Sequence, residues 1–325
     1  MKAYRFTDTQ TPLQLQDIAK PVPGQGQVLI QVKAAGLCHS DCHILEDASY
    51  GLIRQRPLTL GHEVAGTIVE LGSDVSDFAV GDRVARVIAT HPLVDPDRYN
   101  VVGIGYNGGY AEFTVVRQEH ISRIPEGVSF ALGAVATDSI ATAYHAVVAE
   151  GRGEASHTVA IIELGGLGLA AVQIAGLKGA TVYGVDRDTS KFEAARSFGA
   201  VRCAASLDDI ADVSFDIVYD FAGAGVTTTM AAKRTKLGGK VVLVGLAATK
   251  MTLETHDFIT RSIALQGSAG ASKAELEGVL QLVAQGRITQ LVTEIPFRDV
   301  PAGLEELETG RVDGRLWADP SKALS

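Results

Sequence analysis

TVAIIELGGLGLAAVQIAGLKGATVYGVDRDTSK, residues 158–191, decides the fold, because it contains a complete strand, turn, helix and second strand. Residues 158–162 are apolar and rich in β-branched side chains without alternation, which is typical of a parallel strand buried on both faces. Residues 167–177 carry apolar side chains on all sides of a predicted helix. This order predicts a βαβ nucleotide-binding unit.

The turn of this unit contains the residues that a dinucleotide needs. Gly165, Gly166 and Gly168 permit the tight turn, the approach of backbone to pyrophosphate and close packing of helix on strand, and Leu167 lies between them. The helix N-terminus offers N–H groups to phosphate. Asp186 ends the second strand 18 residues after Gly168, near the spacing of ~20 at which an acid meets the adenosine ribose.

One residue departs from the fingerprint. Glu163 stands where the first glycine is expected, so the tight turn carries a side chain. A carboxylate near a phosphate is unfavourable unless it points away. The alternative interpretation is a glycine-rich helix start in another α/β fold.

Composition limits the class of protein. A chain of 325 residues with 46% apolar and 21% charged residues predicts about two domains of a globular enzyme. The net charge of −9 and a pI near 5.4, without a Lys/Arg cluster, argue against nucleic-acid and membrane partners and favour small molecules.

Cysteine content and the first residues suggest a compartment. Cys38, Cys42 and Cys203 are too few for a disulfide framework, and the start MKAYRFTDTQ lacks an apolar signal segment. Residues 159–177 approach the length of a membrane span, but their glycines and polar residues suit a buried strand and helix better. We expect a cytoplasmic protein without transmembrane segments.

The first 125 residues form a different pattern. Apolar residues alternate at Val28, Ile30, Val32 and Ala34, residues 66–71 (GTIVEL) favour a strand, and alternation resumes after residues 108–109. Short strands with turns predict an antiparallel, barrel-like domain.

Three motifs lie within this region: AGLCHSDCHIL at 35–45, PLTLGHEVAGTIVELG at 57–72 and GDRV at 81–84. In these motifs the chain resembles the medium-chain dehydrogenase/reductase family, zinc alcohol dehydrogenase branch, from about residue 3 to residue 320. The resemblance implies a GroES-like antiparallel barrel made of 1–138 with 268–325. It also implies a doubly wound parallel-sheet (Rossmann) cofactor domain at 139–267.

The resemblance further implies a catalytic zinc site. Cys38 and His62 match the first two ligands, and Glu63 matches a carboxylate that can approach the metal. Asp41 matches the carboxylate that holds His62 by its other ring nitrogen. Without the motifs, a buried cysteine and histidine are more often packing residues than ligands.

The resemblance implies that the third ligand comes from residues 134–147, AVATDSIATAYHAV. Asp138 falls where many relatives have cysteine, and a carboxylate preserves the formal charge of the site. A helix-capping aspartate is the alternative interpretation, and His145 is a rival ligand. The cysteine-rich structural-zinc lobe has no counterpart in residues 85–109, so we expect one catalytic and no structural zinc.

Three residues beside Cys38 match a proton path and a phosphate contact. By resemblance, Ser40 takes the substrate proton and His43 passes it to solvent, while His39 meets the cofactor pyrophosphate. The alternative interpretation of the two histidines is that they are solvated loop residues without a role in the reaction.

Cofactor choice depends on the end of the second strand. Asp186 favours NAD(H) over NADP(H) because it repels a 2′-phosphate, Arg187 softens that preference, and Lys191 reaches the same ribose by resemblance. Arg315, in GRVDGRLWADP (310–320), matches an arginine that meets the pyrophosphate. The alternative interpretation of Arg315 is a solvated surface arginine that contacts no cofactor.

The sequence therefore predicts a zinc-dependent, NAD-linked alcohol dehydrogenase or ketone/aldehyde reductase. Two alternatives remain: a zinc-free alkene or quinone reductase of the same superfamily, and a non-enzymatic nucleotide-binding scaffold. Family members pair through a strand edge that corresponds to residues 262–268, so a homodimer or homotetramer is expected.

Overall fold

Two units make up the protein in a computed structural model, which describes all residues except 47–52, 54, 89–90, 92, 94–99 and 323–325. The first unit contains Met1–Ala141 and Gly270–Ser325, and the second contains Thr142–Ala269. The chain crosses between them after residues 141 and 269, where the sequence predicts crossings after 138 and 267. Each unit is described below by itself.

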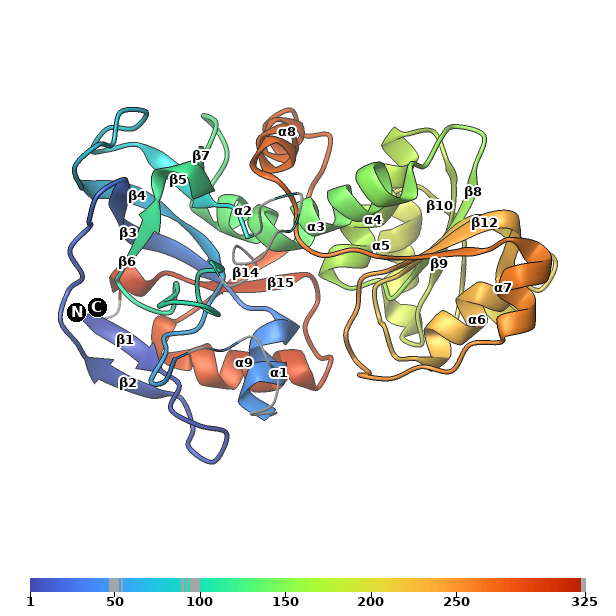
Figure 1. The fold of residues 1–325 in the computed structure, drawn as a ribbon, viewed down its shortest axis with the longest axis horizontal. Helices are drawn as coiled ribbons and strands as arrows, with labels where there is room; N and C mark the ends of the chain where they lie inside the picture. The colour runs from blue at the N-terminus through green and yellow to red at the C-terminus, as the bar shows by residue number, and fades with distance from the viewer. Residues whose placement is uncertain (47–52, 54, 89–90, 92, 94–99, 323–325) are drawn as a thin grey trace. The chain divides into compact units, whose positions relative to one another are not determined.

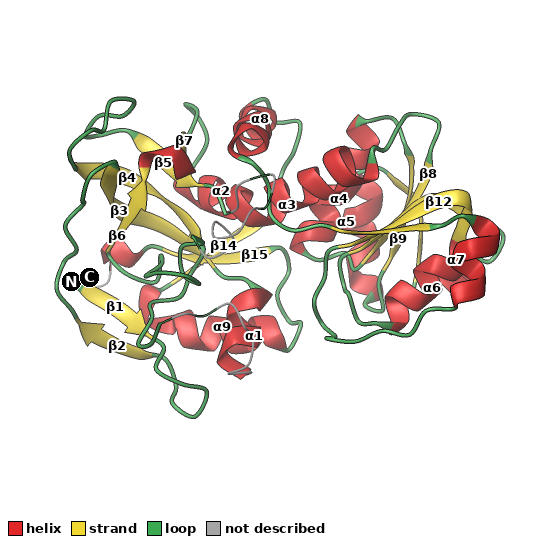
Figure 2. Ribbon diagram, in the orientation of Figure 1, coloured by secondary structure: helices red, strands yellow, loops and turns green. Residues whose placement is uncertain are grey.

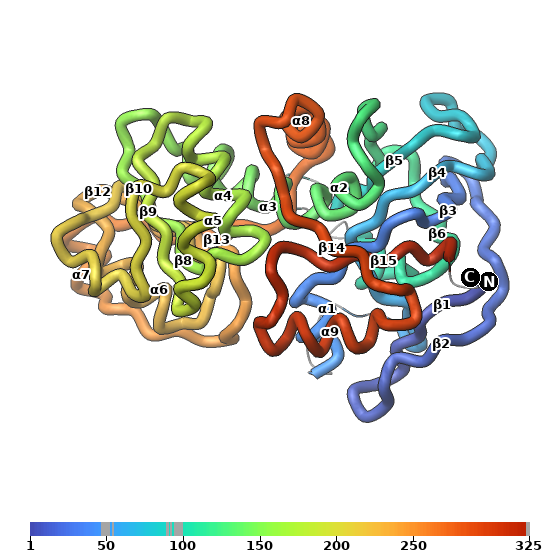
Figure 3. The backbone as a smooth tube through the Cα atoms, turned by 180° about the vertical axis from the view of Figure 1, so that it is seen from behind, coloured from blue at the N-terminus to red at the C-terminus, as the bar shows by residue number. Residues whose placement is uncertain are grey.

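The first unit is built on antiparallel pairing. Strands β1 (Lys2–Arg5) and β2 (Gln14–Asp17) form a hairpin, and a seven-stranded sheet has the order β14-β15-β3-β4-β5-β7, with β6 beside β3. Its strands are β3 (Gln27–Gly36), β4 (Glu63–Leu71), β5 (Arg83–Arg86), β6 (Phe113–Arg117), β7 (Ile121–Arg123), β14 (Val292–Ile295) and β15 (Arg315–Ala318). The late strand β15 pairs with the early strand β3, and β14 lies on the other side of β15 (Figure 3).

Apolar alternation explains the central strand. Val28, Ile30, Val32 and Ala34 of β3 are all fully buried, and the register with β4 shifts between Val32 and Ala34. The core also includes apolar residues of α1 (His39–Glu46) and α9 (Val300–Glu308), which lie side by side (Figure 2). Helices α2 (Phe130–Val135) and α8 (Lys273–Ala284) complete this unit.

The second unit has a parallel sheet of order β10-β9-β8-β11-β12-β13. Its strands are β8 (Thr158–Ile162), β9 (Thr181–Val185), β10 (Ala200–Ala204), β11 (Phe215–Asp220), β12 (Thr235–Leu243) and β13 (Ala264–Gly267). The connections run outward from β8 in one direction and then from β11 in the other. Right-handed crossovers therefore place helices on both faces, as in a doubly wound sheet (Figure 1).

Helix α4 (Gly166–Leu177) follows β8 as the sequence predicts. Its small and apolar residues from Ala170 to Ala175 are buried, which explains its lack of a polar face. It packs against β8, β9 and α5 (Phe192–Ser197), whereas α6 (Val226–Arg234) packs against β11, β12 and α7 (Thr255–Arg261).

No helix within the described ranges is both long enough and apolar enough to cross a membrane. Residues 159–177 form most of the buried strand β8, the turn and helix α4, as the sequence predicts.

Candidate metal centre and dinucleotide turn

The metal centre begins where β3 and β4 pair. Their antiparallel register places Gly36, the last residue of β3, opposite Glu63, the first residue of β4. Cys38 lies just beyond the end of one strand and His62 just before the start of the other, so pairing brings both side chains to one edge of the sheet. A Cβ at Gly36 would lie 1.9 Å from Glu63 Oε2, so only glycine leaves room for this carboxylate.

Asp138 reaches the same place from a distant segment. It lies in a π-helical turn (Ala136–Ile140) inside a helical stretch that begins at α2, where Ser129 is the N-cap. Asp138 is therefore not a helix cap, and that interpretation is wrong. Turns of this type occur often at functional sites because they redirect single side chains.

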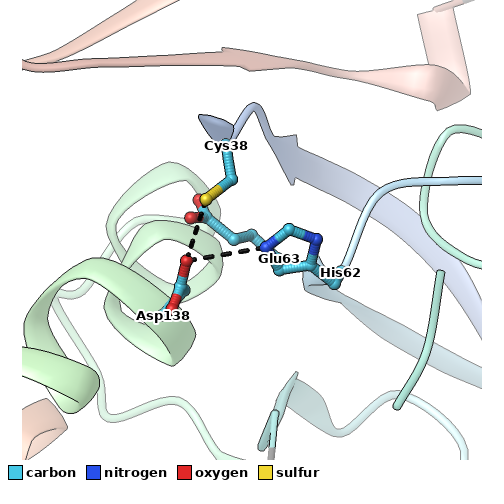
Figure 4. Close-up of side chains that lie close together, drawn as sticks. All are labelled: Cys38, His62, Glu63 and Asp138. Carbon is cyan, nitrogen blue, oxygen red and sulfur yellow. Dashed lines mark hydrogen bonds and ion pairs between the residues drawn. The ribbon is translucent and has the colours of Figure 1, made fainter. Parts of the chain in front are cut away.

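Three side chains converge in Figure 4. Asp138 Oδ2 lies 3.2 Å from Cys38 Sγ and 3.5 Å from His62 Nε2. With Glu63, these residues offer donor atoms that all lie within 4.8 Å of one another. Ligands at zinc distances of ~2.0–2.3 Å in a tetrahedron are separated by about 3.3–3.8 Å. The donor types and spacing therefore fit a zinc ion.

Burial of the four residues shapes their protonation. Burial alone lowers the pKa of His62, but the charge of Asp41 and the hydrogen bond that His62 donates to Asp138 raise it well above its usual value. For Asp138, burial acts to raise the pKa, yet the hydrogen bond and charge of His62 together with Arg315 hold it below its ordinary range.

Glu63, the fourth residue of the donor group, also pairs with a buried cation. Its carboxylate accepts a hydrogen bond from Arg315, which is 3% exposed, so the interpretation of Arg315 as a solvated arginine is wrong. Burial raises the pKa of Glu63 to about 8, and Arg315 acts in the opposite direction. Within the described residues, Glu63 Oε2 and Arg315 Nε have no hydrogen-bond partner. Contact between Arg315 and a cofactor stays a prediction.

The carboxylate of Asp41 lies behind His62. It is fully buried, and its Oδ1 is 3.4 Å from His62 Nδ1, although that nitrogen makes no hydrogen bond within the described part of the chain. The other oxygen, Oδ2, accepts a 2.8 Å hydrogen bond from the hydroxyl of Tyr110. Sequence reasoning missed Tyr110, because nothing in its local pattern distinguishes a buried tyrosine from an ordinary core residue.

Helix α1 carries the three residues assigned to proton transfer and phosphate. Ser40 Oγ lies 3.8 Å from Cys38 Sγ, and His43 follows one turn later on the same face of the helix. Ser40 and His43 are half-buried and His39 is exposed. His145, the rival ligand, lies in the second unit with Nε2 3.3 Å from Glu150, outside the donor cluster.

In the second unit, the glycine turn connects β8 to α4. A Cβ at Gly168 would lie 1.7 Å from the carbonyl oxygen of Glu163, so helix and strand approach closely here. Asp186 follows β9, and its Oδ2 accepts a 2.7 Å hydrogen bond from the N–H of Leu164 and lies 3.3 Å from Lys191 Nζ. The turn and the acid predicted to serve one dinucleotide thus lie together.

The remaining residues of this turn are accessible. Gly165, the N-cap of α4, is half-buried together with Gly166 and Leu167, and Arg187 is exposed beside Asp186. Close packing of helix on strand, partly exposed glycines at the start of α4 and an acid at the next strand fit a dinucleotide.

Sequence comparison assigns both units. A family model described as "Alcohol dehydrogenase GroES-like domain" matches residues 24–126, and one described as "Zinc-binding dehydrogenase" matches residues 166–285. The NAD-dependent alcohol dehydrogenase of Sulfurisphaera tokodaii is 31% identical over 97% of this chain and 99% of its own length.

Solved structures agree with this assignment. Acetophenone reductase from Geotrichum candidum, in complex with NAD, has a TM-score of 0.89 and 32% identity, covering 99% of this chain and 98% of its own. A cobalt- and zinc-bound alcohol dehydrogenase from Pyrobaculum aerophilum has a TM-score of 0.89 and 26% identity, covering 98% and 99%. The chain therefore belongs to the zinc-containing alcohol dehydrogenase branch of the medium-chain dehydrogenase/reductase family.

Proposed function

We propose that the protein is a zinc-dependent alcohol dehydrogenase or ketone/aldehyde reductase that transfers hydride between an alcohol or carbonyl substrate and NAD(H). The observation that carries this proposal is the convergence of Cys38, His62 and Asp138 at ligand spacing in a chain of this family. The curated relative is named as NAD-dependent, and the Geotrichum candidum reductase was solved with NAD, which supports the cofactor.

Cys38, His62 and Asp138 hold the zinc in this proposal. A thiolate and a carboxylate neutralise the charge of Zn²⁺ while histidine stays neutral, so zinc and its three ligands carry no net charge. Bound zinc supplies Lewis acidity, which favours the ionised form of an alcohol near neutral pH or polarises a carbonyl. Asp41 orients His62 from behind, and Arg315 pairs with Glu63 beside the three ligands.

Ser40 and His43 form the proton path. The Ser40 hydroxyl lies next to Cys38, so it is placed to accept the proton of a substrate hydroxyl. His43 lies one turn further along α1, where its half-buried imidazole exchanges that proton with solvent.

The glycine turn, Asp186 and Lys191 bind the dinucleotide. N–H groups at the start of α4 receive phosphate, and Asp186 accepts hydrogen bonds from ribose hydroxyls. Asp186 repels a 2′-phosphate, so NAD(H) is preferred, while the exposed Arg187 weakens this discrimination. His39 and Arg315 are proposed to contact the pyrophosphate, on the resemblance alone.

One experiment tests the function. The purified protein is analysed for zinc by elemental analysis and assayed with a panel of alcohols and ketones under both cofactors. We expect one zinc per chain and zinc-dependent turnover with NAD(H). Activity without metal on activated alkenes favours the zinc-free reductase, and nucleotide binding without any turnover favours the scaffold.

We also propose a homo-oligomer, a dimer or tetramer, that forms through the second unit. Strand β13 is an edge strand with mostly exposed residues, and an open edge invites pairing with another chain. Leu237, Leu246 and Ile259 of the same unit are also exposed. Sedimentation at working concentration tests this, and a mass of one chain contradicts it.

A further inference from the structure

Glu163 lies in the dinucleotide turn in a conformation that suits glycine. Its φ is +75°, in the left-handed region, which is uncommon for a residue with a side chain and costs stability. The chain thus retains a carboxylate at a position where the backbone favours glycine. Strained backbone positions of this kind cluster at ligand sites, where the side chain often has a role in binding.

The Glu163 carboxylate points back into the turn. Its Oε1 accepts a 2.9 Å hydrogen bond from the N–H of Gly165, the N-cap of the twelve-residue helix α4. A Cβ at Gly165 would lie 2.2 Å from this oxygen, so the glycine leaves room for the acid. The preceding N–H, of Leu164, donates to Asp186. Two successive N–H groups of the turn are therefore occupied by the protein's own carboxylates.

We propose that Glu163 sets the affinity for the dinucleotide: its carboxylate occupies Gly165 N–H and repels the cofactor's pyrophosphate at the N-terminus of α4. The inference rests on the proposed function for the identity of the ligand. A helix N-terminus favours one anion, but two anions at the same place repel each other. Glu163 thus competes with the pyrophosphate for the turn and speeds release of the reduced cofactor, a step that often limits turnover in enzymes.

Coulomb's law gives the expected size of the effect of Glu163 on the dissociation constant of the cofactor. Two unit charges ~6 Å apart, at an effective dielectric constant between ~40 and ~80, change the dissociation constant by about threefold to about tenfold. Glu163→Gln removes the charge and keeps an oxygen that can accept from Gly165. Glu163→Gly also frees the N–H and relieves the left-handed strain, so we expect it to bind at least as tightly and to melt at a higher temperature.

The test measures binding to the purified, full-length protein. NADH is titrated by fluorescence, and ADP-ribose and adenosine are measured by their displacement of NADH. We expect Glu163→Gln to tighten NADH and ADP-ribose about threefold to tenfold, with slower NADH dissociation, and to leave adenosine unchanged because it has no phosphate. The gain should shrink at high salt, which a purely structural role of Glu163 would not produce.

Asp212→Asn is the matched control. It removes the same charge from an exposed residue of the same unit, whose partner is Arg202, and should leave all three ligands unaffected. Equal NADH affinity in wild type, Glu163→Gln and Glu163→Gly, with alcohol turnover intact, overturns the inference and spares the function. Tighter NADH without any turnover supports the inference and refutes the function. If no form binds NADH, both are refuted.

Discussion

Replacing Asp138 with alanine tests the metal centre most directly. Asp138 is the only one of the three proposed ligands that comes from outside the β3–β4 pair, and its Oδ2 is within 3.5 Å of both other donors. Removing it leaves Cys38 and His62, one anionic and one neutral ligand, for a divalent cation. We expect the variant to lose zinc and activity together.

The magnitude follows from ligand count and from the position of Asp138 in its helix. Changes in residues that only orient ligands weaken metal binding by ~10–100-fold, so loss of a ligand should weaken it by more than ~100-fold. Helix stability should hardly change, because Ser129 caps the helix and alanine is favoured over aspartate in a helix interior by roughly 0.5 kcal/mol. A loss of zinc larger than any change in metal-free stability explains is the expected signature.

The assay combines elemental analysis with competition against a chromophoric chelator. Thermal unfolding of the metal-free proteins reports stability separately. Asp82→Asn, which removes an exposed carboxylate of the same unit paired with Arg123, is the control and should keep zinc. One zinc per chain in Asp138→Ala, with an unchanged chelator midpoint, would refute the ligand assignment. The third ligand would then be sought first at Glu63 and next at His145.

Three further predictions test other parts of the site. Asp186→Asn should weaken NADH binding and reduce discrimination against NADPH, as measured by kcat/KM for each cofactor; an unchanged ratio would contradict the ribose contact. Tyr110→Phe should cost about 1.5–3 kcal/mol in the free energy of unfolding, since its hydroxyl donates to the buried carboxylate of Asp41. It should also weaken zinc binding by ~10-fold in chelator competition, and unchanged zinc affinity would restrict this tyrosine to a packing role. Burial raises the pKa of Cys42 to about 12, so iodoacetamide at pH 8 should leave it unmodified while chelation makes Cys38 reactive, as read by peptide mass spectrometry.

Local sequence was sufficient to predict the strand and the helix on either side of the glycine turn. Strand β8 and helix α4 lie where the pattern predicts them. An unbroken apolar run, then glycines, then a run of small and apolar residues fits few other arrangements of secondary structure. Strand β10 was missed. Its sequence AVRCA mixes exposed and buried residues at the side of the sheet, where burial imposes little pattern.

The sequence by itself determined which residue types were available for the chemistry. The motifs around Cys38 and His62 and the aspartate at 138 specify a sulfur, a nitrogen and an oxygen donor, and their resemblance to a known family assigned them to zinc. Spacing along the chain cannot show that Asp138, 100 residues from Cys38, comes within 3.2 Å of its sulfur.

Only the tertiary structure decided how these groups meet. The register of β3 and β4 brings Cys38 and His62 to one edge, and a π-helical turn directs Asp138 toward them. Arg315 is buried against Glu63, a pairing that depends on where β15 joins the sheet. The physical reason is that apolar periodicity fixes which face of an element is buried, whereas strand register and side-chain pairing depend on partners distant in sequence.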